Sequence, residues 1–208
     1  MSGGGLGPEQ ARSLEECLAA GGVALFPADT VYGLAADPEA EQAVARLYAL
    51  KGRAPDKPAA VMFFDLEPAM AIAANGPRLE RALRALLPGP VTVLVPNARR
   101  RFPLAGAGDL DTLGLRVPLL PDRLHALTGV RQALLQSSAN RAGGPDPTRL
   151  SEVPAGIRER VDLTLDGGPL PGVASTVIDL RRWEREGSWQ VLRTGALSEA
   201  EVERRLGA

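Results

Sequence analysis

Three basic side chains are concentrated in the segment LKGRAPDKP, residues 50–58, namely Lys51, Arg53 and Lys57. The prolines prevent the preceding helix from continuing, so these cations lie on a constrained loop. An arginine can donate a forked pair of hydrogen bonds to phosphate or carboxylate oxygens, and lysines add point charges beside it. The segment therefore indicates an anion site. The alternative is an ordinary helix end, because Lys51 is followed by Gly52.

Small polar side chains follow an apolar run in ALLQSSANRAGG, residues 133–144. The side chains of Ser138 and Asn140 can bond phosphate oxygens, a ribose or an adenine edge. Gly143 and Gly144 allow the backbone to approach a ligand closely. The segment predicts a nucleotide contact at a strand end, and its alternative is a helix cap or an Asx turn.

The segment DTVYGL, residues 29–34, also directly follows an apolar strand. Residues that leave a strand end commonly line the ligand crevice of an α/β sheet. Thr30 and Tyr32 can hydrogen-bond a small polar substrate there. The alternative is a plain turn in which Asp29 bonds nearby backbone amides.

Two arginines lie in otherwise apolar strands, Arg116 in LGLRVP and Arg193 in WQVLRTG. A charge in such a place must be paired or face a cavity. For Arg116 the choice is an Asp or Glu partner or a carboxylate-bearing ligand, and Arg193 poses the same choice. Thr112 lies just before the first strand. Ser175 begins a Ser/Thr-containing strand after the flexible segment GGPLPG.

The composition limits the classes of protein to which the chain can belong. Its 208 residues are 45 % hydrophobic with a net charge of −1, which fits one domain and argues against nucleic-acid binding by bulk charge. Cys17 and His125 are the single cysteine and histidine, so an internal disulfide and a Cys/His zinc site are excluded. With neither a membrane span nor a signal peptide in the sequence, we expect a cytoplasmic protein that contacts no membrane.

Two standard nucleotide-binding motifs are absent from the sequence. There is no G-x-x-x-x-G-K-[ST] segment, and no G-x-G-x-x-G follows a strand. If phosphates bind to this chain, side-chain cations and loop amides must therefore hold them in another arrangement.

Helical and strand patterns intermingle along the chain, which predicts an α/β fold with a mixed parallel and antiparallel sheet flanked by helices. A flexible tail is expected over residues 1–8 and a single domain over residues 9–208. Loops are expected over residues 29–38 and 145–154. Helices are expected over residues 8–20, 39–51, 78–87, 121–127 and 198–206. Strands are expected over residues 23–27, 60–64, 91–96, 113–118, 133–136, 161–166, 175–180 and 189–193.

Seven segments together resemble the YrdC-like family, the threonylcarbamoyl-AMP synthases. They occur in the order FPADTVYGL, LKGRAPDKP, LPGPVTVLVP, LGLRVP, SSANRAGG, DGGPLPGVASTVIDL and VLRTGAL. The family signature K-x-R followed by S-x-N is matched by Lys51 and Arg53 and by Ser138 and Asn140. The resemblance runs from about residue 10 to residue 206. By this resemblance we expect the short form of the family, without the extra C-terminal domain.

The resemblance implies a basic concave cavity and an enzyme that joins L-threonine, bicarbonate and ATP. The products would be threonylcarbamoyl-AMP and pyrophosphate, with Mg²⁺ expected to accompany ATP. Separate transfer proteins would then pass the threonylcarbamoyl group to an adenosine of certain tRNAs. Clustered cations would be the main catalytic device, because negative charge accumulates on phosphoryl oxygens.

The resemblance also implies a role for each candidate residue. Lys51 and Arg53 would be catalytic, holding the phosphates and stabilising their charge with help from Lys57. The other expected ATP contacts are Thr112, Ser138, Asn140 and Arg193. The expected threonine contacts are Thr30, Tyr32, Arg116 and Ser175.

Two departures from the family pattern bear on the choice of substrate. Ala28 stands where the family usually has a threonine on the amino-acid side of the pocket, and Leu120 stands where a histidine is frequent. The first departure leaves open a carbamoyl-adenylate enzyme with another acceptor. An RNA-binding module of the same fold, or a weak contact with tRNA, is a further alternative. A riboflavin-pathway synthase of this architecture is disfavoured, because its acidic metal-binding stretch is not visible.

Overall fold

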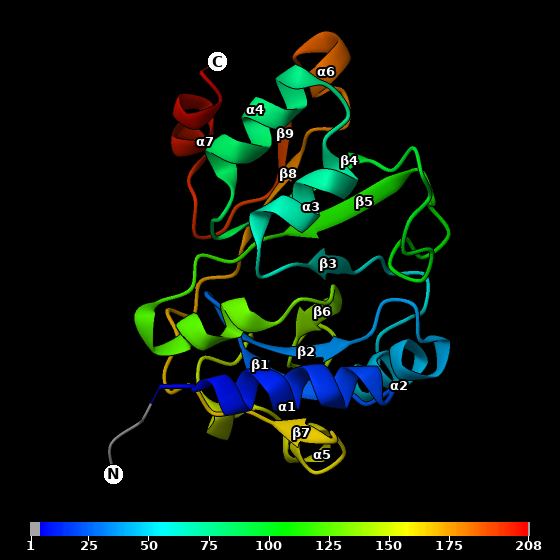
Figure 1. Ribbon diagram of the computed structural model, residues 1–208, viewed down its shortest axis with the longest axis vertical. Helices are drawn as coiled ribbons and strands as arrows, with labels where there is room; N and C mark the ends of the chain where they lie inside the picture. The colour runs from blue at the N-terminus through cyan, green and yellow to red at the C-terminus, as the bar shows by residue number, and fades with distance from the viewer. Residues whose placement is uncertain (1–4, 208) are drawn as a thin grey trace.

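One mixed sheet of nine strands organises residues 5–207, the part of the chain that the computed structural model describes (Figure 1). The strands are β1 (Ala24–Pro27), β2 (Tyr32–Ala36), β3 (Ala60–Met62), β4 (Val91–Pro96), β5 (Thr112–Arg116), β6 (Leu134–Ser138), β7 (Leu163–Thr164), β8 (Thr176–Asp179) and β9 (Gln190–Arg193). Their order across the sheet is β7-β1-β2-β6-β3-β5-β4-β8-β9. The pairs β1–β7, β3–β5 and β4–β8 are parallel, and the other neighbours are antiparallel. The expected mixed α/β fold is confirmed.

Helices of different lengths connect the strands. The α-helices are α1 (Pro8–Ala19), α2 (Glu41–Lys51), α3 (Leu66–Ala73), α4 (Pro77–Leu86), α5 (Ala155–Arg158), α6 (Trp183–Glu186) and α7 (Glu199–Leu206). Two 3₁₀-helices, η1 (Asp122–Gly129) and η2 (Leu150–Glu152), complete the set within the described residues. Figure 1 shows α1, α3 and α4 lying in front of the strands, and α3 packs against β5.

Strand β5 shows how the sequence separates the two faces of the sheet. Leu113 and Leu115 are buried in the hydrophobic core, whereas Thr112, Gly114 and Arg116 point to the opposite face, as alternation along a strand requires. The core face therefore carries the helices, and the other face is free to form a site.

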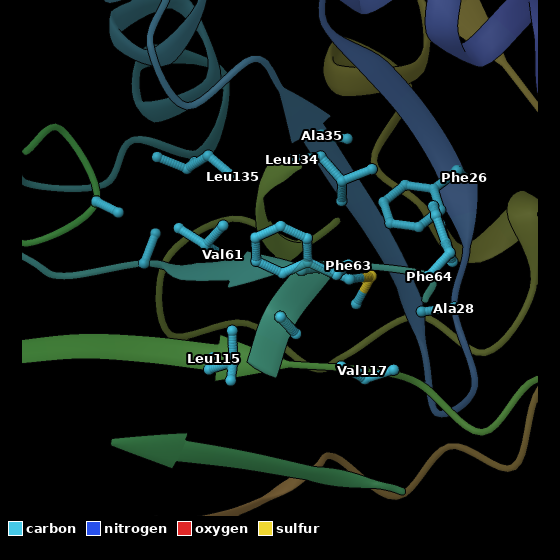
Figure 2. Close-up of a cluster of buried hydrophobic side chains, with 14 of the residues drawn as sticks. Phe26, Ala28, Ala35, Val61, Phe63, Phe64, Leu115, Val117, Leu134 and Leu135 are labelled. Carbon is cyan, nitrogen blue, oxygen red and sulfur yellow. The ribbon is translucent and has the colours of Figure 1, made fainter. Parts of the chain in front are cut away.

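The hydrophobic core is built mainly from aliphatic side chains with a few aromatic rings (Figure 2). Phe26 from β1 meets Phe64 edge to face, with ring centroids 6.2 Å apart. Val61 of β3 and Leu115 of β5 are neighbours across the parallel β3–β5 pair and are both fully buried. The core thus fixes the central strands whose other faces carry polar residues.

Strand β2 is the largest difference from the sequence-based expectation, which placed a turn-rich loop over residues 29–38. Its sequence, YGLAA, contains glycine and alanine, which are poor strand formers. Pairing with β1 on one side and β6 on the other nevertheless holds it extended and buried. Tertiary pairing thus overrides local preference here.

Several element boundaries also differ from expectation. Helix α3 was not expected; Asp65 caps it by accepting a hydrogen bond from the backbone N–H of Glu67. Strand β6 continues through Ser138 rather than ending at residue 136. A short 3₁₀-helix, η2, lies within the expected loop 145–154.

The first residues that the structure describes lead directly into helix α1. Of the tail expected over residues 1–8, residues 1–4 lie outside the described residues, as does residue 208. The backbone N–H of Leu6 donates to the carbonyl of Arg123, and α1 already starts at Pro8. None of the helices within residues 5–207 has both the length and the apolar character needed to span a membrane.

Candidate active site

A cavity of 420 Å³ lies on the face of the sheet that carries the polar side of β5. Strands β3, β4, β5, β6, β8 and β9 all contribute to its wall, together with the loop before β3 and the turn before β2. Seven of the eleven residues expected at the site line this cavity, namely Thr30, Arg53, Thr112, Arg116, Ser138, Ser175 and Arg193. The sheet therefore brings together groups that lie up to 163 residues apart in the sequence.

Arg53 is the cation of the loop after α2 that reaches the cavity. Its Nη2 donates to the carbonyl of Pro58 at 2.7 Å, and its guanidinium lies 5.8 Å from the ring centroid of Tyr48. The buried Nε has no hydrogen-bond partner within residues 5–207. Arg53 thus brings a positive charge to the cavity wall, which suits an anionic ligand.

Lys51 points to a strand end rather than into the cavity. Its Nζ donates to the side-chain Oδ1 and the carbonyl of Asn140, each at 2.9 Å, and to the carbonyl of Ser138. The side chain is 2 % exposed, and burial, assisted by the nearby charge of Arg53 and opposed by Asp146, lowers the pKa of Lys51 to about 8. Lys51 thus fixes the end of β6 directly behind the cavity wall.

The Ser-x-Asn segment forms a closed network around that lysine. The hydroxyl of Ser138 donates to Asn140 Oδ1 at 2.7 Å, and the Asn140 amide donates to the carbonyl of Gly144. The backbone N–H of Ala142 donates to the carbonyl of Lys51. Ser138 lines the cavity, whereas the buried Asn140 supports it from behind. The segment thus shapes a turn and brings Ser138 to the cavity, and its contact with a nucleotide stays a prediction.

Arg116 is both paired and directed at the cavity. Its Nη2 lies 2.7 Å from Asp29 Oδ1 and 3.4 Å from Thr30 Oγ1, while its Nε is buried without a partner in the described chain. Desolvation lowers the pKa of Arg116 and raises that of Asp29, and each group opposes the shift of the other. The ion pair thus holds the charged guanidinium of Arg116 at the cavity wall.

Gln136 was missed by sequence reasoning although it lines the cavity beside Arg116. Its Oε1 accepts a hydrogen bond from Arg116 Nη1 at 3.2 Å. A Cβ on Gly33 would lie 2.8 Å from Gln136 Nε2, so a larger residue there would displace the Gln136 amide. The signal was a polar residue within an apolar strand, which is paired on both sides by β2 and β3.

Ser175 and Arg193 come together although they were expected beside different ligands. Arg193 Nη2 donates to the carbonyl of Ser175 at 2.8 Å and to its Oγ at 3.2 Å. The charge of Arg193 also contributes to the lowered pKa of Arg116. Arg193, expected beside ATP, therefore lies at the end of the cavity where the amino-acid residues were expected.

Thr112 lies at the other end of the cavity, within a group of charges. Its Oγ1 accepts from Arg181 Nη1 at 3.3 Å, and hydrogen bonding from Thr112 lowers the pKa of Asp109. Arg181 is held by a bidentate ion pair with Asp179. Neither Arg181 nor Asp109 was expected at the site. Arg181 belongs to an arginine-rich segment that in sequence looks like an ordinary exposed turn.

Two expected site residues lie elsewhere. Tyr32 is fully buried, and its hydroxyl donates to Asp166 Oδ1 at 2.8 Å and accepts from the backbone N–H of Gly167 at 3.1 Å. Lys57 is exposed outside the cavity lining, and its carbonyl accepts from the Tyr48 hydroxyl. Neither residue lines the described cavity, and the contacts of Tyr32 with threonine and of Lys57 with ATP stay predictions. Inclusion in β2 turns Tyr32 away, and the loop turns Lys57 into solvent.

Ala28, which stands where the family usually has a threonine, also lies outside the cavity wall. Ala28 is fully buried and lies in the apolar cluster with Phe26 and Phe64 (Figure 2). It is not among the described residues that line the cavity. The nearest hydroxyl of that turn, on Thr30, does line the cavity and approaches Arg116. The polar groups at this end of the site are therefore present despite the missing threonine.

The cavity offers few ligands for a metal of its own. Within residues 5–207 no group of three or more His, Cys, Asp or Glu side chains is placed to hold an ion. Asp109 and Asp146 are the carboxylates of the described lining. Such a site suits Mg²⁺ carried in on phosphates, since that ion commonly takes only one or two protein carboxylates.

The register of the sheet separates the site into two ends. Gly114 of β5 lies between Thr112 and Arg116 and pairs with Ala60 on one side and Leu94 on the other. The two outer residues are four positions apart, which is about 13 Å along a strand. An elongated ligand can therefore lie across Gly114, with one end near Thr112 and the other near Arg116.

Comparison with known proteins agrees with this geometry. The family model Sua5/YciO/YrdC, described as "Telomere recombination", matches residues 16–195. A protein of Pyrococcus abyssi named threonylcarbamoyl-AMP synthase is 33 % identical over 189 residues, which is 90 % of this chain and 54 % of that protein. One of the same name from Chromohalobacter salexigens is 38 % identical over 170 residues, covering 79 % of this chain and 89 % of its own length.

Solved structures show the same fold. P. abyssi Sua5 complexed with L-threonine matches with a TM-score of 0.83 and 30 % identity over 97 % of this chain and 58 % of its own. E. coli YciO, at 23 % identity, matches with a TM-score of 0.77. The chain thus spans little more than half the length of the P. abyssi protein. The family match over most of its length shows that this chain belongs to the Sua5/YciO/YrdC family.

Proposed function

We propose that the chain is an L-threonylcarbamoyl-AMP synthase, which forms threonylcarbamoyl-AMP and pyrophosphate from L-threonine, bicarbonate and ATP. The observation that carries this proposal is the gathering of Arg53, Ser138, Arg116 and Ser175 around one cavity. Relatives named threonylcarbamoyl-AMP synthase and the L-threonine complex of P. abyssi Sua5 support the choice of reaction. With tRNA as the final recipient through separate transfer proteins, we place the protein in the cytoplasm.

The two ends of the cavity divide the substrates. L-threonine lies at the end formed by Thr30, Arg116 and Ser175, where the positive charge of Arg116 and the hydroxyls suit a carboxylate. The phosphates of ATP lie beside Arg53 and Ser138. The adenosine continues toward Thr112, and Mg²⁺ accompanies the phosphates.

This placement of the substrates allows threonylcarbamoyl-AMP to form in two steps. The amine of L-threonine and bicarbonate give a carbamate and water, and a carbamate oxygen then attacks the α-phosphorus. The bond from that phosphorus to the β-phosphate oxygen breaks, so pyrophosphate takes the electron pair. Arg53 stabilises the charge on the phosphoryl oxygens, and the cavity holds the reactants in line. Lys51 holds Ser138 in position beside the same oxygens by donating to its carbonyl. Its positive charge, which lies behind the cavity wall, also stabilises them.

The proposal is tested by measuring pyrophosphate release with each substrate omitted in turn. Release should require ATP, bicarbonate and L-threonine together, and L-serine should support it poorly. Release with no amino acid, or equally with serine, would contradict the threonine assignment. Tight, steeply salt-dependent tRNA binding without any release would instead identify an RNA-binding module.

Titration of Lys51 predicts a pH dependence of ATP binding. Because the folded protein holds the pKa of Lys51 at about 8, the ammonium charge behind the phosphate site is present below that pH and is lost above it. We expect the Kd of ATP to rise about tenfold as the pH passes from below to above this value, the size of a lost charge interaction of about 1.4 kcal/mol. Calorimetric titrations across this range measure it, and a constant Kd would exclude the proposed role of Lys51.

Gly114 provides a steric test of the shared cavity. In Gly114→Val the Cβ contacts Ala60 Cα and Leu94 Cδ2 at about the ordinary distances of 3.5 Å and 3.6 Å, while the added methyls enter the cavity. The Kd values of both L-threonine and ATP should rise at least about tenfold, since an overpacked contact costs about 1–3 kcal/mol. Gly114→Ala is the matched control and should change either Kd much less. Unchanged binding in the valine variant would place the ligands elsewhere.

A further inference from the structure

A buried hydroxyl that the proposed reaction does not yet use lies beside the amino-acid end of the cavity. Thr92 of β4 lines the cavity and is 8 % exposed. Its Oγ1 lies 2.9 Å from Ser175 Oγ, the one side-chain partner it has within the described chain. Leu115 of β5 pairs with Val93, so Arg116 lies next to Thr92 across the sheet.

Proton counting shows what this pair of hydroxyls can offer to a ligand. Ser175 Oγ already accepts a hydrogen bond from Arg193 Nη2 at 3.2 Å. The two hydroxyls of Thr92 and Ser175 share one proton between them. The second hydroxyl proton has no acceptor within residues 5–207, and both residues face the cavity. The pair therefore presents one O–H donor to whatever occupies this end of the cavity.

The charged groups around the Thr92–Ser175 hydroxyl pair indicate which kind of ligand oxygen would accept its free proton. Two guanidinium groups, of Arg193 and Arg116, flank the hydroxyl pair closely enough for the first to affect the pKa of the second. A cationic surrounding with a free O–H donor suits an anionic oxygen, and hydrogen bonds to charged groups are stronger than neutral ones. Under the proposed function, such an oxygen at this end of the cavity belongs to the carboxylate of the amino-acid substrate.

We propose that Thr92 is a positioning residue for the amino-acid substrate, orienting the Ser175 hydroxyl so that Ser175 and Arg193 together bind its carboxylate. This inference rests on the proposed function. Thr92 acts through Ser175, so its contribution disappears when the Ser175 hydroxyl is absent. A side chain needed only to fill space would make its contribution in either background.

Replacing Thr92 by valine isolates the hydroxyl from the shape of the side chain. Valine is nearly isosteric with threonine and, like it, is β-branched and favoured in strands. Calorimetry should find the Kd of L-threonine about tenfold higher in Thr92→Val, the effect of losing a hydrogen bond worth about 1.5 kcal/mol. The Kd of ATP should stay near its wild-type value. Thr92→Ser, which keeps the hydroxyl, should bind L-threonine about as tightly as the wild-type protein does.

The double variant separates positioning from packing. Thr92→Val combined with Ser175→Ala should bind L-threonine no more weakly than Ser175→Ala alone, because the two residues act as one unit. Additive losses, an unchanged Kd in Thr92→Val, or equal losses for L-threonine and ATP would overturn the inference. Thermal unfolding checks each variant, and Thr92→Ala, which also lacks the hydroxyl, carries the test if the valine variant does not fold. A wild-type protein that binds no L-threonine would instead contradict the proposed function, and this inference with it.

Discussion

Arg53→Ala should lower the rate of pyrophosphate release about 100- to 1,000-fold, the loss typical of removing one donor that stabilises developing charge. Arg53 lines the cavity with a buried Nε that has no partner among the described residues. The hydrogen bond from Arg53 to the carbonyl of Pro58 lies within one loop, so the fold should remain intact without it. Single-turnover measurement of pyrophosphate release compares the chemical step in the wild type and in Arg53→Ala. Circular dichroism of the two proteins checks that both are folded.

Lys57→Ala removes a second cation from the same loop and serves as the comparison. Lys57 is exposed and lies outside the cavity lining, so its loss should change the rate by about twofold or less, as for other surface substitutions. Equal losses in the two variants would show that the loop acts by general positive charge. A rate unchanged by Arg53→Ala would remove the main electrostatic element of the mechanism.

Arg116→Met should have the largest effect on folding stability. Removal of the guanidinium leaves the carboxylate of Asp29, which is 8 % exposed, buried without its cationic partner. Breaking one side of a buried ion pair costs about 3–5 kcal/mol of unfolding free energy. Urea denaturation followed by fluorescence measures this loss, and binding of L-threonine should disappear in the same variant.

The double variant Arg116→Met with Asp29→Asn separates stability from binding. Replacing both charges leaves no unpaired ion, and asparagine can still accept from the backbone N–H of Leu119. Most of the unfolding free energy should return, while L-threonine binding should not. Recovery of binding would show that Arg116 serves the fold alone.

Arg116 illustrates how far a sequence can lead on its own. An arginine in the strand LGLRVP must be paired or face a cavity, and the structure shows that it does both. The alternation in that strand also places Thr112 and Arg116 on one face. Such local rules need only neighbouring residues, which explains why these strands could be predicted.

The contacts that the sequence did not reveal join residues that are distant in the sequence. Lys51 was expected to hold phosphates, but its Nζ bonds to Ser138 and Asn140, 87 and 89 residues further on. Tyr32 was expected in a turn, yet pairing of β2 with β6 buries it and leaves its hydroxyl to Asp166. No local pattern contains these partners.

Other site residues were missed because an ordinary structural role already explains each of them in the sequence. Thr92 and Gln136 lie in strands where one polar side chain is common, and Arg181 lies in a charged turn. Their roles emerge only when the sheet register brings them around a single cavity. The cavity itself was expected by resemblance, whereas its division into two ends follows from the positions along β5.

The central claim is that a single cavity holds the amino acid and the nucleotide together. A crystal structure of the wild-type protein with L-threonine and a non-hydrolysable ATP analogue tests it most directly. The account predicts the carboxylate of L-threonine beside Arg116 and Ser175, and the phosphates beside Arg53 and Ser138, with Gly114 beneath the reacting atoms. Either ligand bound outside this cavity, or the phosphates bound at the Arg116 end, would contradict it.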